Sequence, residues 1–172
     1  MSRITPVSRL LTALALLCVV NLAAAEGSVE AGQQKAATCA ACHGPDGNSL
    51  NPEWPSLAGQ NARYLEEALK SFRPGGSRDN VLMLGQVAAL SDQDMADLAA
   101  FYASQTRAPR TADPALITAG ERLYRGGNKD RGIAACIACH GPQGVGNPQA
   151  AYPALAGQHA TYTAAQLRAY AS

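Results

Sequence analysis

Two nine-residue segments carry the side chains best suited to chemistry. CAACHGPDG occupies residues 39–47, CIACHGPQG occupies residues 136–144, and the two agree at seven positions. Each contains a Cys-x-x-Cys pair with a histidine directly after the second cysteine, in a chain with three histidines in all. The candidate ligands are Cys39, Cys42 and His43 in the first segment and Cys136, Cys139 and His140 in the second.

Two thiols beside an imidazole are compatible with three chemistries. Zinc takes four ligands where each segment offers three, and the spacing between the two pairs is far longer than in a zinc ribbon. A dithiol redox site, or a pair of disulfides, does not need a histidine after both pairs. Covalently bound haem uses all three side chains, because the thiols add to its vinyl groups and the histidine binds iron. We therefore predict two haem c groups (iron), with zinc and dithiol chemistry as the alternatives.

The similarity between the two segments extends along the chain as an internal repeat. PSLAGQ at residues 55–60 matches PALAGQ at residues 153–158. Apolar residues recur at helical spacing and no segment alternates as a strand would, so the predicted fold class is all-α. The predicted domains are residues 26–106 and 115–172, joined by a linker at residues 107–114. The predicted helical segments are residues 29–42, 61–72, 91–104, 114–124 and 159 onward.

Residues 1–25 have the pattern of a cleavable export signal. Two arginines precede an apolar run at residues 10–20, and small residues end at Ala25, after which we predict cleavage. Cys18 lies within the apolar run, where the alternative interpretation is a lipid anchor. The predicted location is the periplasm. The whole chain has a net charge of +1, which gives no strong field for nucleic acid or for an anionic membrane surface.

Three sets of residues carry a resemblance to a known family: both CxACHGPxG segments, both PxLAGQ segments, and LSDQDMADLAAFY from Leu90. In these motifs the chain resembles the cytochrome c superfamily, and more closely its dihaem cytochrome c4 family. The resemblance implies two class I cytochrome c domains that carry single electrons in the bacterial periplasm and are not enzymes. It also implies redox-protein partners, such as a quinol-oxidising complex as donor and a terminal oxidase as acceptor.

A class I domain also takes a sixth iron ligand, which in the family is a methionine in the loop before the last helix. Met83 stands at that place, in a predicted loop, and is the predicted sixth ligand of the first haem. Met95 is the alternative, although it lies on the apolar stripe of a predicted helix, where methionine usually belongs to the core. Thioether sulfur favours ferrous iron, which suits an electron carrier.

The second copy of the repeat is shorter than the first. Ser172 aligns with Pro74, so nothing in the second half corresponds to residues 75–104, and we expect the second domain to lack its distal-methionine loop and last helix. Three explanations stand: the sequence is a fragment, the second haem is five-coordinate, or another group such as His159 fills the sixth position. The second explanation gives the alternative function, a haem enzyme or gas-binding module that uses an open second haem.

Weaker signals concern the groups around each haem. The prolines that open the two PxLAGQ segments are candidates to accept the Nδ1–H of the haem-segment histidines, with plain turn prolines as the alternative. Arg73 and Arg78 are candidates to pair with haem propionates, with solvated loop charges as the alternative. His159 aligns with Asn61 at a helix start, so we expect a surface or capping residue there.

Overall fold

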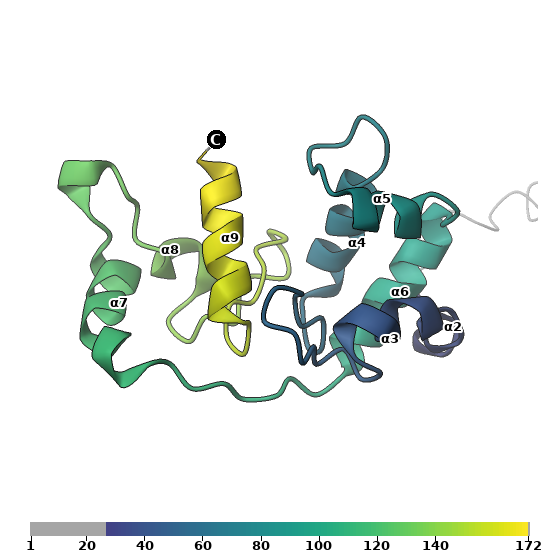
Figure 1. The fold of residues 1–172 in the computed structure, drawn as a ribbon, viewed down its shortest axis with the longest axis horizontal. Coiled ribbons are helices and arrows are strands. Elements are labelled where there is room, and N and C mark those ends of the chain that lie inside the picture. The colour runs from purple at the N-terminus through teal and green to yellow at the C-terminus, as the bar shows by residue number, and fades with distance from the viewer. Residues whose placement is uncertain (1–26, 172) are drawn as a thin grey trace, which may run out of the picture.

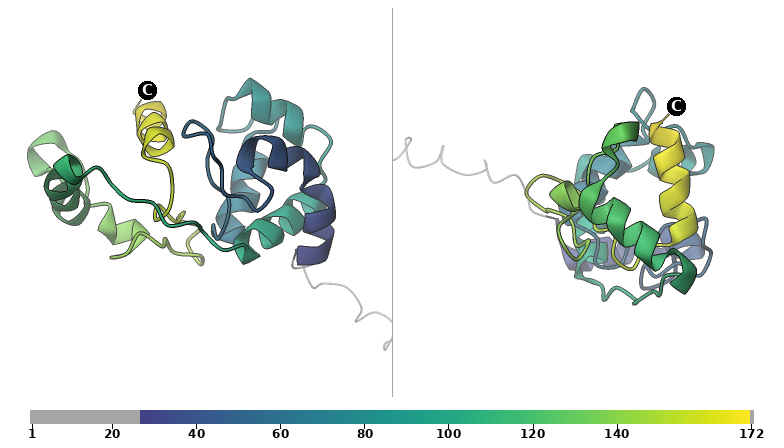
Figure 2. Two further views of the ribbon diagram at one scale, coloured as in Figure 1. Left: turned by 60° about the horizontal axis from the view of Figure 1, so that its bottom comes forward. Right: turned by 90° about the vertical axis from the view of Figure 1, so that its left-hand side faces the viewer.

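The computed structural model describes residues 27–171, whose helices gather at the two ends of an elongated molecule (Figure 1). An extended segment, residues 105–113, runs along one edge between the two groups (Figure 2). The predicted export signal, with Cys18 and its cleavage site, lies outside the described residues. The first half contains α2 (Val29–Lys35), α3 (Ala37–His43), α4 (Ala62–Ser71), α5 (Val81–Val87) and α6 (Asp92–Ser104). The second half contains α7 (Pro114–Gly126), η1 (Lys129–Arg131), α8 (Ile137–His140) and α9 (Ala160–Tyr170).

The predicted all-α class is confirmed. Between residues 27 and 171 the only extended pairing consists of two isolated bridges, Asn128 with Ile133 and Asn147 with Tyr152. Within that same stretch, none of the helices combines the length and the apolar character that crossing a membrane requires.

The core of the first half forms where α2 and α4 pack against α6. Gly32 lets α2 approach α6 closely, because a Cβ built there would lie 2.0 Å from the carbonyl oxygen of Asp97 and 2.7 Å from the Cβ of Phe101. The helices therefore meet almost backbone to backbone at this point. The buried cluster around the crossing consists of Ala36, Leu65, Leu98, Ala99, Phe101 and Tyr102.

Polar groups at the start of α6 fix the same crossing. The Ser91 hydroxyl accepts from the backbone N–H of Asp94, whose carboxylate in turn accepts from the backbone N–H of Ser91, which is a capping box. These bonds to Ser91 lower the pKa of Asp94 to about 2. Lys35 at the end of α2 makes a 3.0 Å ion pair with Asp94, and this pair ties α2 to the first turn of α6.

Two details of the sequence-based helix assignment are wrong. Residues 29–42 form two helices, α2 and α3, which meet at Ala36. Met83 lies in a helix, α5, because the Asn80 side chain caps that helix by accepting from the backbone N–H groups of Leu82 and Met83, each at 3.0 Å. The Asn80 cap was the available signal, since asparagine is a favoured N-cap residue.

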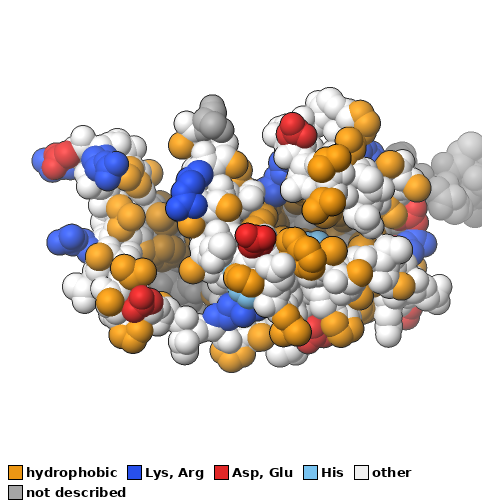
Figure 3. Space-filling model, in the orientation of Figure 1, with side chains coloured by type: hydrophobic (Ala, Val, Ile, Leu, Met, Phe, Trp, Pro, Cys, Tyr) orange, Lys and Arg blue, Asp and Glu red, His pale blue; other side chains and the backbone are white. Residues whose placement is uncertain are grey.

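The second half lacks a comparable packed core among the described residues. Neither α7 nor α9 contains a buried residue. Gly120 of α7 is the counterpart of Gly32 in a shared Ala-Gly pair, yet a Cβ built there meets nothing within 4 Å. Figure 3 shows apolar side chains at the surface of both halves. The large apolar residues left exposed on α7 and α9 are Leu116, Ile117, Leu123, Leu167 and Tyr170.

The glycine pair gives a direct test of this difference in packing. Gly32→Ala is expected to destabilise the protein by about 1–3 kcal/mol, because the added methyl group overlaps backbone atoms that cannot move independently. Gly120→Ala should leave stability unchanged or raise it by a few tenths of a kcal/mol, since alanine has the higher helix propensity and open space surrounds it. Thermal unfolding of the two variants measures the difference, and equal melting temperatures would refute it.

Candidate functional site

The first Cys-x-x-Cys-His segment lies on α3 and ends it. Cys39 and Cys42 are three residues apart on the helix, so their side chains share one face. Both are free thiols, Cys39 half-buried and Cys42 exposed. His43 is the last residue of α3, and the chain turns away at Gly44, whose φ of +83° favours glycine. The segment thus presents two thiols and an imidazole from one short rigid element.

The His43 ring is oriented by a single hydrogen bond. Its Nδ1 donates to the carbonyl oxygen of Pro55 at 2.8 Å, while Nε2 makes no hydrogen bond to any described residue. Burial lowers the pKa of His43, although the bond to Pro55 acts in the opposite direction. The neutral ring therefore offers its Nε2 lone pair to a metal, as a ligating histidine must.

The second segment repeats this arrangement on α8. Cys136 and Cys139 are free thiols, half-buried and exposed respectively, as in the first segment. The Nδ1 of His140 donates to the carbonyl oxygen of Pro153 at 2.9 Å. The candidate role of the two prolines as hydrogen-bond acceptors, rather than plain turn residues, is thereby confirmed.

A glycine carbonyl holds each Pro-x-Leu-Ala segment in place. Gly47 O accepts from the N–H groups of Leu57 and Ala58 at 2.7 and 3.0 Å, and Gly144 O accepts from the corresponding pair in the second half at 2.7 and 2.9 Å. The HGPxG and PxLAGQ motifs are therefore two parts of one loop. Each loop carries the proline carbonyl back to its histidine.

The residues around the first segment fit a covalently bound haem. Tyr102 Oη is buried, has no hydrogen-bond partner among residues 27–171, and lies beside the Cys39 thiol. Burial, with the adjacent thiol, raises the pKa of Tyr102 well above its usual range, and burial likewise raises the pKa of Cys39. An unsatisfied hydroxyl at this position marks a place where a further group would complete the environment. In residues 27–171, no three or more His, Cys, Asp or Glu side chains form a cluster that could hold a metal ion.

The candidate sixth ligands differ sharply in their access to solvent. Met95 is fully buried in the core between the helices, whereas Met83 is partly exposed on α5. His159 is buried, and its Nε2 bonds the carbonyl oxygen of Ser49 at 2.9 Å, so the expected surface position is wrong, although His159 does occupy the expected N-cap position of α9. That bond also occupies the ring nitrogen with which His159 would ligate iron.

The two arginines proposed for haem propionates are engaged within the protein. Arg73 pairs with Asp92 at 2.6 Å and donates to the carbonyl oxygen of Leu90 at 3.0 Å. Arg78 donates to the hydroxyls of Tyr64 and Tyr170. The alternative interpretation as a solvated loop charge is therefore wrong for Arg78, whereas Arg73 keeps a third of its side chain exposed in an ion pair at the surface.

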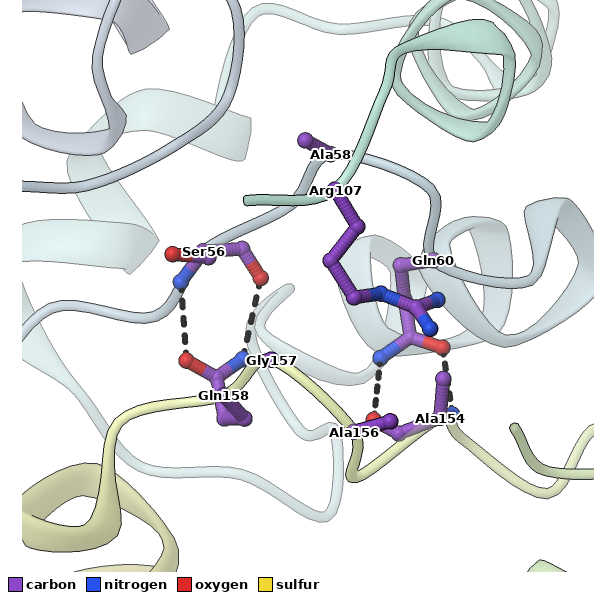
Figure 4. Close-up of a pocket in the computed structure, with 8 residues that line it drawn as sticks. All are labelled: Ser56, Ala58, Gln60, Arg107, Ala154, Ala156, Gly157 and Gln158. Carbon is purple, nitrogen blue, oxygen red and sulfur yellow. Dashed lines mark hydrogen bonds between the residues drawn. The ribbon is translucent and has the colours of Figure 1, made fainter. Parts of the chain in front are cut away.

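The two halves meet through a reciprocal pair of glutamines (Figure 4). The Gln60 amide donates to the carbonyl oxygen of Ala154 at 2.9 Å and accepts from its N–H at 2.7 Å. In the same way, the Gln158 amide accepts from the N–H of Ser56 and donates to its carbonyl oxygen, with both bonds at 2.9 Å. Because Gln60 and Gln158 end the two PxLAGQ motifs, each half uses the same residue to bind the same position of the other.

The helix starts and the linker add to this interface. Asn61 donates its side-chain amide to the carbonyl oxygen of Tyr152 at 2.6 Å, and His159, at the corresponding position, bonds Ser49. Arg107 of the linker donates to the carbonyl of Gly59, and Arg110 donates to the equivalent carbonyl in the second half at 3.0 Å. This interface was not predicted from the sequence, where the available signal was the glutamine repeated at the end of each PxLAGQ segment.

Comparisons with known proteins agree with this geometry. The sequence model of the family described as Cytochrome c matches residues 29–106 and 117–172. The cytochrome c4 of Azotobacter vinelandii is 51% identical over 166 residues, which cover 92% of this chain and 79% of that protein. A crystal structure of reduced recombinant cytochrome c4 from Pseudomonas stutzeri superimposes with a TM-score of 0.79 at 50% identity, over 83% of this chain and 79% of that one. A less similar relative, the thiosulfate dehydrogenase electron acceptor of Thiomonas intermedia (strain K12), is 40% identical over 86% of this chain and 69% of that protein.

The chain therefore belongs to the cytochrome c family. Within that family it falls in the dihaem cytochrome c4 group, whose members are electron-transfer proteins with two covalently bound haem c groups.

The hydrogen bonds that Gln60 and Gln158 make across the interface lead to a prediction. Gln60→Ala and Gln158→Ala are each expected to cost about 1–3 kcal/mol of stability, because each leaves a buried N–H and carbonyl of the other half unpaired. Both variants should also be cleaved faster by trypsin after Arg107 and Arg110. Urea unfolding and timed proteolysis measure the two effects. The exposed Gln143→Ala is the matched control, and cleavage at the same rate in all three variants would contradict the prediction.

Proposed function

We propose that this chain carries single electrons between redox proteins in the periplasm, with one haem held by α3 and a second by α8. The observation that carries the proposal is the repeated geometry of two free thiols and one histidine whose Nδ1 donates to a proline carbonyl. The export pattern of residues 1–25 supports the periplasmic location.

The chain's own residues have distinct parts in this function. Cys39 and Cys42 would form the thioether bonds to the first haem and His43 would bind its iron. In the second half the corresponding residues are Cys136, Cys139 and His140. When bound, haem c supplies a one-electron couple between ferric and ferrous iron. The hydrogen bond to each proline carbonyl increases the basicity of the ligating imidazole and prevents its rotation.

Met83 is the proposed sixth ligand of the first haem. Its alternative, Met95, has no exposed surface and packs within the core of α6. Recruiting Met95 would empty a buried position and cost the stability of a large core side chain, about 2–5 kcal/mol. Met83 is partly exposed, and its segment begins at the Asn80 cap after a glycine-rich loop, so it can reach a haem without disturbing the core.

Weak and transient docking suits the proposed partners. Residues 1–25 contain two of the 14 basic side chains and none of the 13 acidic ones. Their removal would therefore leave 12 basic and 13 acidic side chains and a net charge of −1. Such a surface gives little electrostatic steering, which is typical of short-lived redox encounters. The family resemblance supports a quinol-oxidising complex as donor and a terminal oxidase as acceptor, and the similarity to a thiosulfate dehydrogenase electron acceptor supports an oxidising enzyme as donor.

One observation favours a second candidate function. Among the described residues, the Nε2 of His159, the remaining candidate ligand of the second haem, is already bound to the carbonyl oxygen of Ser49 at 2.9 Å. A second haem without a sixth ligand would be open, as in a haem enzyme or a gas-binding module. Against that function, the histidine and arginine that lie together beside the second half, His159 and Arg110, both bond the carbonyl oxygen of Ser49 and are not free to cleave an oxygen–oxygen bond.

Carbon monoxide separates the two candidate ligands of the first haem. Ferrous Met83→Ala protein is expected to bind the gas at the first haem, because removal of the thioether opens the sixth position, and its reduction potential should fall. Met95→Leu should keep the parent spectrum and lose only stability. Absorption spectra with and without the gas give the answer, and binding in Met95→Leu alone would reverse the assignment.

The unsubstituted protein provides its own test of the second haem. Carbon monoxide binding to the ferrous parent protein, retained in a His159→Ala variant, would establish an open second haem and favour the gas-binding function. The intact mass of the secreted protein is expected to exceed the mature chain by two haems, and a Cys136→Ser/Cys139→Ser variant by one. A parent mass without haem would contradict the proposed function.

A further inference from the structure

Arg78 occupies an unusual position between the two halves. It lies in the loop between α4 and α5, and its Nη2 donates to Tyr64 Oη at 2.9 Å and to Tyr170 Oη at 3.2 Å. Tyr64 belongs to α4 and Tyr170 to α9, so one guanidinium group joins helices of both halves. In Figure 1 this loop and the C-terminal end of α9 both lie at the upper side of the molecule.

The surroundings of Arg78 are aromatic rather than acidic. Its guanidinium carbon lies 5.6 Å from the centre of the Tyr64 ring and 5.5 Å from that of Phe72, both within cation–π range. Tyr162 lies close enough to interact electrostatically with the same group. Burial raises the pKa of Tyr162 to about 12, so it stays a neutral phenol at neutral pH. Within the described residues Arg78 makes no ion pair with a carboxylate.

The aromatic side chains around Arg78 are repeat partners. Tyr64 corresponds to Tyr162 and Phe72 corresponds to Tyr170 in the aligned halves. Corresponding aromatic side chains of α4 and α9 are therefore joined at this point by Arg78, which comes from the first half alone. Its contribution makes an otherwise symmetric contact asymmetric.

A short and well-fixed path connects Arg78 to Met83. The Arg78 backbone N–H bonds the carbonyl oxygen of Ser71 at 3.0 Å, which closes the loop against the end of α4. Two residues later Asn80 caps α5 and bonds the backbone N–H of Met83 itself at 3.0 Å. A displacement of Arg78 would therefore also displace the first turn of α5.

We propose that Arg78 is a positioning residue that ties the Met83 segment of the first half to α9 of the second, so that the contact between the halves strengthens the bond from Met83 to the first haem iron. The inference rests on the proposed role of Met83 as the sixth ligand. Its physical basis is that α9 holds the Arg78 side chain, Arg78 holds the loop, and the loop fixes the start of α5.

Competition by added imidazole in the ferric holoprotein tests the proposal. Imidazole displaces a methionine ligand, and the charge-transfer absorption of Met-ligated ferric haem reports only on a haem that has such a ligand. Arg78→Gln is expected to raise the apparent affinity for imidazole about tenfold, since it removes charge-assisted hydrogen bonds to two phenols. Tyr170→Phe, which removes one of the two bonds from the second half, should raise it about threefold.

Arg63→Gln is the matched control. Arg63 also extends from α4 to the second half, where it bonds the carbonyl oxygen of Gln149 at 2.6 Å, but it does not contact the loop that leads to Met83. Its imidazole affinity should equal that of the parent protein even if the contact between the halves is weakened. Arg78→Lys serves as a milder variant if Arg78→Gln folds poorly.

Four results would overturn the proposal. Unchanged imidazole affinity in Arg78→Gln would show that the loop does not need the guanidinium group. An effect in Arg78→Gln with none in Tyr170→Phe, or full rescue by Arg78→Lys, would show that Arg78 acts within the first half or simply as a positive charge. Persistence of the charge-transfer absorption in Met83→Ala would identify a different failure, that of the ligand assignment in the proposed function, and the inference would fall with it.

Discussion

The hydrogen bond from a histidine Nδ1 to a proline carbonyl is the contact on which each half depends. It joins the end of a short helix to a loop that returns 12 residues later in the first half and 13 in the second. Because Pro55 is fixed by that bond, the residues after it are fixed as well. They bond Gly47 within their own half and extend Gln60 into the other half. One motif of six residues therefore orients the ligand, closes the loop and builds the interface.

Recognition between the halves is directed at the backbone. Gln60 bonds the N–H and carbonyl of Ala154, and Gln158 bonds the same groups of Ser56. Alanine and serine can stand at equivalent positions because neither side chain takes part in these bonds. The interface thus tolerates divergence between the two copies while it preserves their relative orientation. A fixed orientation suits two redox centres that exchange electrons, since the separation between them then stays constant.

The described residues pack differently in the two halves. In the first, α6 closes a core in which Gly32 lets two helices touch, and Asn80 caps the helix that carries Met83. In the second, the described part of α7 buries no residue and Gly120 faces open space.

The cofactor and the main helices of this protein could be predicted from its sequence, because both depend on interactions between residues close together in the chain. The Cys-x-x-Cys-His spacing is a covalent requirement of the haem, so the cofactor could be predicted. The cap at Ser91 and the apolar stripe of residues 91–104 act within a few residues of each other, so the helix there could be predicted as well. The sequence did not reveal that His159 is buried against Ser49, that Asn61 bonds Tyr152, or that Arg78 lies between aromatic rings of both halves. Those contacts join residues about 90 to 110 positions apart. Only the tertiary structure decided them, because a side chain's partner depends on which distant backbone is folded against it.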